Sequence, residues 1–82
     1  MPRELTAPRR WLIVGFGSIG RRHLDNLTRL GQQEVLVVDP DPSAQAAARR
    51  SHAVEAVGTL EEGFARRPDA VLVANPTAFH LE

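Results

Sequence analysis

The sequence predicts an α/β fold, a partial doubly wound parallel sheet of about four strands in the order 3-2-1-4 with three helices. Two observations support this prediction. Short apolar runs alternate with segments of helical periodicity, so that the chain reads strand, helix, strand, helix, strand, helix, strand. A glycine-rich turn directly follows the first apolar run, and such a turn lies where the strand order reverses. A helix that connects two strands of one sheet forms a right-handed crossover, and strands joined by such crossovers are parallel.

The first third of the chain contains an arm, a strand and a helix. Residues 1–10 have two prolines, three arginines and no periodicity, which predicts a flexible N-terminal arm. Residues 11–14 (WLIV) are predicted to form the first strand. The helix that follows is predicted to end at Gly31, a natural C-terminal cap. Its predicted inward face consists of Ile19, Leu24, Leu27 and Leu30, and its outward face of Arg21, Arg22, Asp25 and Arg29.

The turn between this strand and this helix has the spacing GxGxxG. Its residues are Gly15, Phe16, Gly17, Ser18, Ile19 and Gly20. The first glycine allows a turn that a Cβ would forbid, the second lets a diphosphate approach the backbone, and the third lets the helix pack against the strand. The helix N-terminus then offers free N–H groups and the positive end of its dipole. These six residues are therefore predicted to bind the diphosphate of a dinucleotide, with Ser18 also capping the helix, in a Rossmann fold.

Asp39 lies about 20 residues after the glycines, at the end of a second apolar run, residues 35–38. A carboxylate at the tip of the second strand can accept hydrogen bonds from the ribose hydroxyls of adenosine, and it repels a 2′-phosphate. It therefore predicts NAD rather than NADP as the cofactor, and no arginine follows it closely enough to clamp a 2′-phosphate. The alternative is that Asp39 only opens the turn made by residues 39–42 (DPDP), since Asp and Pro are turn formers.

A second helix and a third strand are predicted next. Asp41 has the position of an N-cap and Pro42 that of the first helical residue, ahead of the alanine-rich residues 43–50. Because this helix can bury little but alanine, it is predicted to lie close to the sheet. Residues 53–57 are predicted to form a short third strand.

A third helix is predicted from a capping box. Thr59 and Glu62 have the spacing at which a hydroxyl and a carboxylate satisfy each other's end of a helix. This helix is predicted to turn Leu60 and Phe64 inward and to end at Pro68.

The fourth strand is predicted over residues 69–74 (DAVLVA), an almost continuous apolar run that suits a strand covered on both faces. Residues 75–82 are predicted to begin another helix. Because no fifth strand follows within the sequence, the edge of the fourth strand is predicted to be apolar and unpaired. Two chains are therefore expected to associate as a homodimer through this edge or a swapped element.

Composition excludes several classes of function. Ten arginines balance ten acidic residues, and this balance favours neither nucleic acid nor a membrane surface as a partner. The chain has no cysteine, which excludes disulfides and thiolate chemistry. Its three histidines are too far apart for a metal-ligand spacing, so no metal site is predicted. The Ser, His and Asp residues suggest no catalytic triad. The apolar runs are too short to span a membrane, and a cytoplasmic location is expected.

Three segments together resemble one protein family. They are residues 15–27 (GFGSIGRRHLDNL), 37–40 (VVDP) and 59–80 (TLEEGFARRPDAVLVANPTAFH). In this register they are similar to the N-terminal domain of the glucose-fructose oxidoreductase and inositol 2-dehydrogenase (Gfo/Idh/MocA) family of NAD(P)-dependent oxidoreductases. The resemblance implies that residues 11–82 are the N-terminal portion of a dinucleotide-binding domain, itself incomplete. It also implies hydride transfer between nicotinamide and a sugar-like or polyol hydroxyl.

The resemblance also implies further site residues. In that family the loop after the fourth strand lies along the adenosine and ribose of the cofactor. The matching positions are Ala74, Asn75, Pro76, Thr77 and His80. The family's catalytic elements, a Glu-Lys-Pro segment and an aspartate and a histidine in a second domain, are not in this sequence, which has no lysine. No catalytic residue is therefore assigned, and these 82 residues alone are not expected to turn over.

Two other classes of function remain open. One is a non-catalytic nucleotide-binding or sensing module, like the regulatory domains of potassium transport, which does not require the segment 75–80. The other is a methyltransferase-like nucleoside binder, which is less favoured because no acidic residue directly precedes Gly15.

Overall fold

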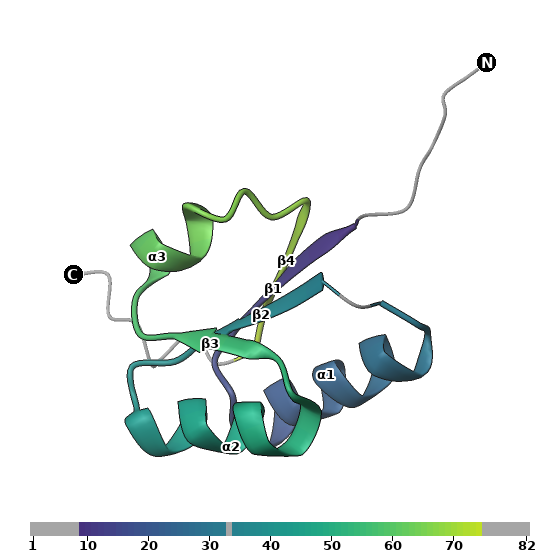
Figure 1. Cartoon of the computed structure of the whole chain (residues 1–82), viewed down its shortest axis with the longest axis horizontal. Helices are drawn as coiled ribbons and strands as arrows, with labels where there is room; N and C mark the ends of the chain where they lie inside the picture. Colours follow the sequence, from purple (N-terminus) through teal and green to yellow (C-terminus); the bar gives the residue numbers. More distant parts are fainter. Residues whose placement is uncertain (1–8, 33, 75–82) are drawn as a thin grey trace.

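The computed structural model describes residues 9–32 and 34–74, and it has the predicted architecture (Figure 1). Its parallel strands are β1 (Arg10–Val14), β2 (Glu34–Val38), β3 (Glu55–Val57) and β4 (Ala70–Val73). Its helices are α1 (Ser18–Arg29), α2 (Pro42–His52) and α3 (Leu60–Phe64). The strands form one sheet in the order β3-β2-β1-β4, which confirms the predicted order.

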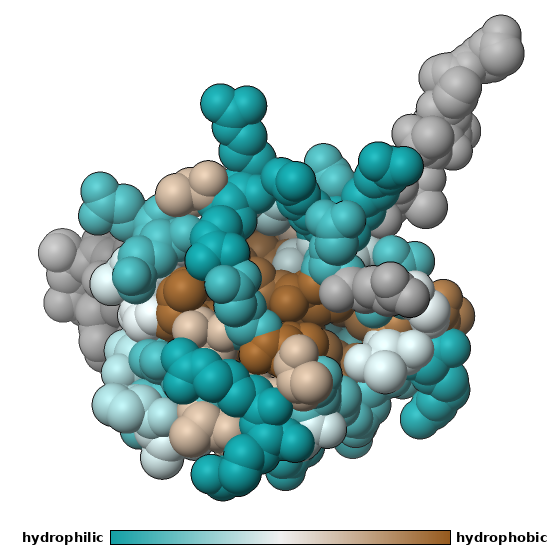
Figure 2. Space-filling model, viewed as in Figure 1, coloured by the Kyte–Doolittle hydropathy of each residue, from teal (hydrophilic) through white to brown (hydrophobic). Residues whose placement is uncertain are grey.

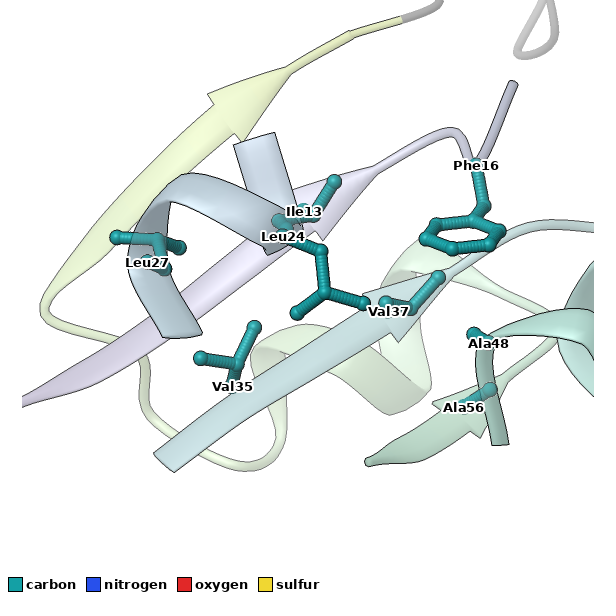
Figure 3. Packing of buried hydrophobic residues seen from close by; sticks show 8 residues of the cluster. All are labelled: Ile13, Phe16, Leu24, Leu27, Val35, Val37, Ala48 and Ala56. Carbon is teal, nitrogen blue, oxygen red and sulfur yellow. The ribbon is translucent and has the colours of Figure 1, made fainter. Parts of the chain in front are cut away.

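The sheet separates two layers of helices. Figure 1 shows α1 and α2 on one face and α3 on the other. Side chains of β1 and β2 alternate between these faces, as the period of a strand requires. On the α1–α2 face they belong to a cluster of Ile13, Phe16, Leu24, Leu27, Val35, Val37, Ala48 and Ala56 (Figure 3). On the α3 face they form a second cluster of Leu12, Val14, Leu36 and Val38, against which Leu60 packs.

Three helix ends confirm the predicted local signals, namely the C-terminal end of α1 and the N-terminal ends of α2 and α3. Gly31 has a φ of 83° and closes α1, because its N–H donates to the Thr28 carbonyl and that of Gln32 to the Leu27 carbonyl. A carboxylate oxygen of Asp41 accepts from the Ser43 N–H at 3.0 Å and caps α2. At α3 the full capping box is present between Thr59 and Glu62.

The inward face of α1 is narrower than predicted. Leu24 and Leu27 are buried, but Ile19 is 55% exposed and Leu30 is 74% exposed. At 3.6 residues per turn, positions 19 and 30 lie about a quarter turn from the line midway between Leu24 and Leu27. Both therefore lie on the same side of the buried stripe and outside it, so they do not reach the sheet as Leu24 and Leu27 do.

Helix α3 is shorter than predicted. It ends at Phe64 and not at Pro68, because the chain turns tightly after it and Arg67 takes a φ of 56°. Phe64 is 51% exposed, so its predicted inward position is wrong. The helix comes closest to the sheet at Gly63, where a Cβ would lie 2.6 Å from Val38 Cγ2. Phe64 follows this contact by about 100° of helix rotation and points away from it.

Strand β4 is covered on one face only, against the prediction. Val71 is 39% exposed and Val73 is 58% exposed. The register pairs them with Leu12 and Val14, so they lie on the α3 face. Helix α3 packs over β1 and β2 and leaves these two valines uncovered. Figure 2 shows apolar side chains at the centre of the displayed face, with polar side chains around them.

Asp69 holds the start of β1. Arg10, predicted as the last residue of the flexible arm, is the first residue of the strand. The N–H groups of Arg9 and Arg10 both donate to Asp69 Oδ2, at 3.0 and 2.9 Å. Residues 1–8 and 75–82, which include the remainder of the predicted arm and the predicted final helix, lie outside the described residues.

Candidate functional site

The bend between β1 and α1 is shaped by its three glycines. Gly15 has a φ of 95°, and its N–H donates to the Val38 carbonyl at 2.7 Å, which ties the bend to β2. A Cβ on Gly20 would collide with the Gly15 carbonyl oxygen, so the helix starts in contact with the bend. Among residues 9–32 and 34–74, and apart from the chain neighbours of Gly17, no heavy atom lies within 4 Å of the position that a Cβ would take on Gly17. The backbone is therefore open to a ligand at the middle glycine.

The amino end of α1 is uncapped. Its N-cap is Gly17, which has no side chain to accept a hydrogen bond, and the first turn contains no acidic residue. Ser18 is the first helical residue, so its predicted capping role is wrong. The first N–H of the helix with a helical partner is that of Arg21, which donates to the Gly17 carbonyl at 2.9 Å. In the part of the chain described, no side chain caps this end, whereas α2 and α3 both have side-chain caps. Unclaimed N–H groups and the helix dipole attract an anion there.

Asp39 faces this bend. The residue is only 7% exposed, and its Oδ2 accepts a hydrogen bond from the Phe16 N–H at 2.8 Å. Its Oδ1 accepts from the Asp41 N–H at 2.9 Å. Asp39 therefore opens the turn after β2, as the alternative interpretation expected, and also braces the glycine bend. Each carboxylate oxygen keeps a second lone pair that a ribose hydroxyl can use.

Phe16 contributes to the site through its backbone. Its ring is buried among Ile13, Leu24 and Ala48 (Figure 3), and its N–H is already bound by Asp39. The guanidinium carbon of Arg21 lies 5.6 Å from the centroid of the ring. Phe16 thus shapes the bend, and the N–H groups left for a diphosphate are those that follow it.

Gln45 supports the site and was missed by sequence reasoning. Its Nε2 donates to the backbone carbonyl of Asp39 at 2.8 Å, which fixes the chain that presents the carboxylate. The only available signal was its position one turn after the N-cap Asp41, which places it over the end of β2.

The end of β4 lies beside the bend. The Ala74 N–H donates to the Val14 carbonyl at 2.8 Å, and Ala74 Cβ lies 3.5 Å from the Cβ position of Gly20. The sheet order places β1 between β2 and β4, so the strand order reverses at this bend. The predicted cofactor-lining residues Asn75, Pro76, Thr77 and His80 lie outside the described residues.

A row of three hydrogen-bonded side chains joins α1 and α2. Ser51 Oγ lies 2.6 Å from His52 Nδ1, and His52 Nε2 lies 2.6 Å from Asp25 Oδ1. Although these are the residue types of a nucleophilic triad, Ser51 and His52 lie at the C-terminal end of α2, where the negative end of the helix dipole would repel an oxyanion. These three side chains therefore join two helices and do not form a centre for acyl transfer.

Within residues 9–32 and 34–74, no group of three or more His, Cys, Asp or Glu residues can hold a metal ion. No helix in the same ranges is both long enough and apolar enough to span a membrane.

Comparison with known proteins gives one match. The family model GFO_IDH_MocA, described as an oxidoreductase family with an NAD-binding Rossmann fold, matches residues 9–82. No curated protein and no solved structure matches the chain.

Proposed function

The chain belongs to the Gfo/Idh/MocA oxidoreductase family, and we propose that it binds the adenosine diphosphate half of NAD at the bend between β1 and α1. One observation carries this proposal: α1 alone among the described helices begins without a side-chain cap, beside the open space over Gly17. An anion at this point can accept hydrogen bonds from N–H groups that no described side chain uses. The diphosphate of a dinucleotide is such an anion.

The choice of NAD over NADP rests on Asp39. Its carboxylate is buried at the tip of β2 and faces the bend, where the adenosine ribose follows the diphosphate. A 2′-phosphate there would bring two negative groups together in a poorly solvated position. The preference for NAD is thus an electrostatic property of one residue.

Calorimetric titration of the 82-residue chain tests both proposals. We expect NAD and ADP-ribose to bind with similar affinity and NADP to bind at least tenfold more weakly, because the contacts end at the ADP half. Equal binding of NAD and NADP would contradict the role of Asp39. Absence of binding by either dinucleotide and by ADP-ribose would contradict the site itself.

We propose that the reaction served by this site is hydride transfer between nicotinamide and a sugar-like or polyol hydroxyl. Bound NAD supplies the hydride acceptor, and residues 9–74 bind and orient its ADP half. The support is the family match. The family's Glu-Lys-Pro segment does not lie within these 82 residues, because they contain no lysine. The DNA downstream of codon 82 tests this: an in-frame Glu-Lys-Pro codon run supports it, and a stop codon favours a sensing module.

A further inference from the structure

The peptide between Asp39 and Pro40 lies next to the hydrogen bonds that hold the Asp39 carboxylate. One carboxylate oxygen accepts from the Phe16 N–H at 2.8 Å, and the other accepts from the Asp41 N–H at 2.9 Å. The Asp41 N–H belongs to the next peptide along the chain, so a rotation of the Asp39–Pro40 peptide would move it away from the carboxylate. Because proline has no N–H, the Asp39 carbonyl is the only polar group by which this peptide can be held.

Gln45 of α2 holds this carbonyl. Its Nε2 donates to the Asp39 carbonyl oxygen at 2.8 Å. The backbone of Gln45 is itself fixed in the first turn of α2, because its N–H donates to the Asp41 carbonyl at 3.1 Å. A side chain on a helix is placed more precisely than one on a loop. The peptide that precedes the Asp41 donor is therefore held by a rigid element.

Two neighbours confine the side-chain amide of Gln45. Nη2 of Arg49, one turn further along α2, lies 3.5 Å from Gln45 Oε1 and donates to the Ala56 carbonyl of β3 at 2.9 Å. The nitrogen of the amide lies near Gly58, where a Cβ would be 3.3 Å from Gln45 Nε2. A side chain at position 58 would press on the donor nitrogen, so glycine there leaves the nitrogen room for its bond.

We propose, on the basis of the NAD site proposed above, that Gln45 is a positioning residue for the adenosine ribose. By holding the Asp39 carbonyl, it keeps the Asp39 carboxylate in place to accept hydrogen bonds from the ribose hydroxyls. Gln45 acts through Asp39 and needs no contact with the ligand. If Gln45 only joined α2 to the sheet, its loss would lower stability without changing the share of the affinity that comes from the ribose.

A pair of ligands isolates the ribose contact. ADP-ribose and its 2′-deoxyadenosine analogue differ by one hydroxyl, so the ratio of their dissociation constants measures what that hydroxyl contributes. For the unmodified chain we expect calorimetry to find the analogue about tenfold weaker or more, because the hydroxyl donates to a charged group. Gln45→Met keeps the length of the side chain and removes its N–H donor. We expect this variant to lower the ratio at least about threefold, chiefly by weakening ADP-ribose.

A second variant acts on Gln45 without replacing it. In Gly58→Ala the added methyl group would lie 3.3 Å from Gln45 Nε2. The backbone of Gly58 is held, because its N–H donates to Glu62 Oε1 at 3.2 Å. We therefore expect the Gln45 amide to move and the ratio to fall, as in Gln45→Met. The matched control is Gln32→Met, which removes the acceptor of the Trp11 Nε1–H at 3.2 Å, near the start of β1. This control should keep the ratio of the unmodified chain.

The outcomes separate the role of Gln45 from the proposed site. An unmodified chain that binds neither ADP-ribose nor its analogue would overturn the site and the role of Gln45 together. If the unmodified chain discriminates between the two ligands and both variants keep its ratio, the site stands and the positioning role is wrong. Equal weakening of both ligands by Gln45→Met, with lower stability in urea, would also overturn that role, because it would show that Gln45 only supports the fold.

Discussion

Asp39 stabilises the bend in addition to facing the proposed ribose site. Its two carboxylate oxygens accept from the N–H groups of Phe16 and Asp41, and the residue is buried. Removing a carboxylate from such a place leaves buried donors without an acceptor. A loss of cofactor binding in an Asp39 variant is therefore interpretable only if its folding is measured as well.

We predict that Asp39→Ala lowers the free energy of unfolding by about 2 kcal/mol in the absence of cofactor, because an unsatisfied buried N–H costs about 1–3 kcal/mol. Asp39→Asn keeps an acceptor oxygen, so it should lose less stability while the discrimination against NADP falls. Urea denaturation gives the first quantity and calorimetry the second. Unchanged stability in Asp39→Ala would show that the carboxylate does not brace the bend.

Local signals in the sequence were sufficient for the caps of α2 and α3, but not for Ser18, which does not cap α1. Asp41 and the Thr59–Glu62 pair cap their helices as predicted, because a cap depends on residues within one turn. The position of Asp39 at the tip of β2 was predictable, because it directly follows the apolar run of residues 35–38. Its bond to Phe16 was not, since it joins residues 23 positions apart.

At the scale of elements, the amino ends of β1 and β4 are joined through one carboxylate. Asp69 Oδ2 accepts from the N–H groups of Arg10 and Arg9 just where β1 begins. These two backbone donors, that of Arg10 first, hold the pKa of Asp69 below its ordinary value. Ionised Asp69 therefore stabilises the folded state above the ordinary pKa.

We predict that this stabilisation is present above about pH 4 and is lost as the pH falls below it, because protonation of Asp69 removes the charge that the two N–H groups favour. The Asp69→Asn variant should be less stable than the unmodified chain at pH 7, and the difference should shrink as the pH falls from 4 towards 2. Urea midpoints from pH 7 to pH 2 measure this difference. A constant difference across this range would mean that Asp69 does not titrate with folding.

Element packing was less predictable than element identity. The run AVLV is apolar at every position, so it could not show that β4 is open on its α3 face. Phe64 has the spacing of an inward residue relative to Leu60. It is exposed because α3 meets the sheet at Gly63 and ends one residue later. Both errors concern which neighbour covers a surface, and a pattern within one element does not contain that information.

For the molecule as a whole, alternation, handedness and the position of the glycine turn were enough to predict the strand order. Right-handed crossovers place β2 and β3 on one side of β1 and β4 on the other. This arrangement brings the glycine bend, Asp39 and Ala74 together at the carboxyl ends of the strands. At the amino ends of the strands there is a separate hollow between the sheet and the α3–β4 connection. It is bordered by the ion pairs Arg10–Glu34 and Arg66–Glu55.

If the uncapped amino end of α1 holds the diphosphate, a side-chain cap placed there should compete with it, and Gly17→Asp supplies such a cap. Gly17 is the N-cap, has extended backbone and has free space at its Cβ position, so an aspartate there can cap the helix without strain. We predict that calorimetry finds at least tenfold weaker binding of NAD to Gly17→Asp, while urea denaturation finds stability unchanged or raised by up to about 1 kcal/mol. NAD binding of undiminished affinity in a folded Gly17→Asp chain would contradict the claim.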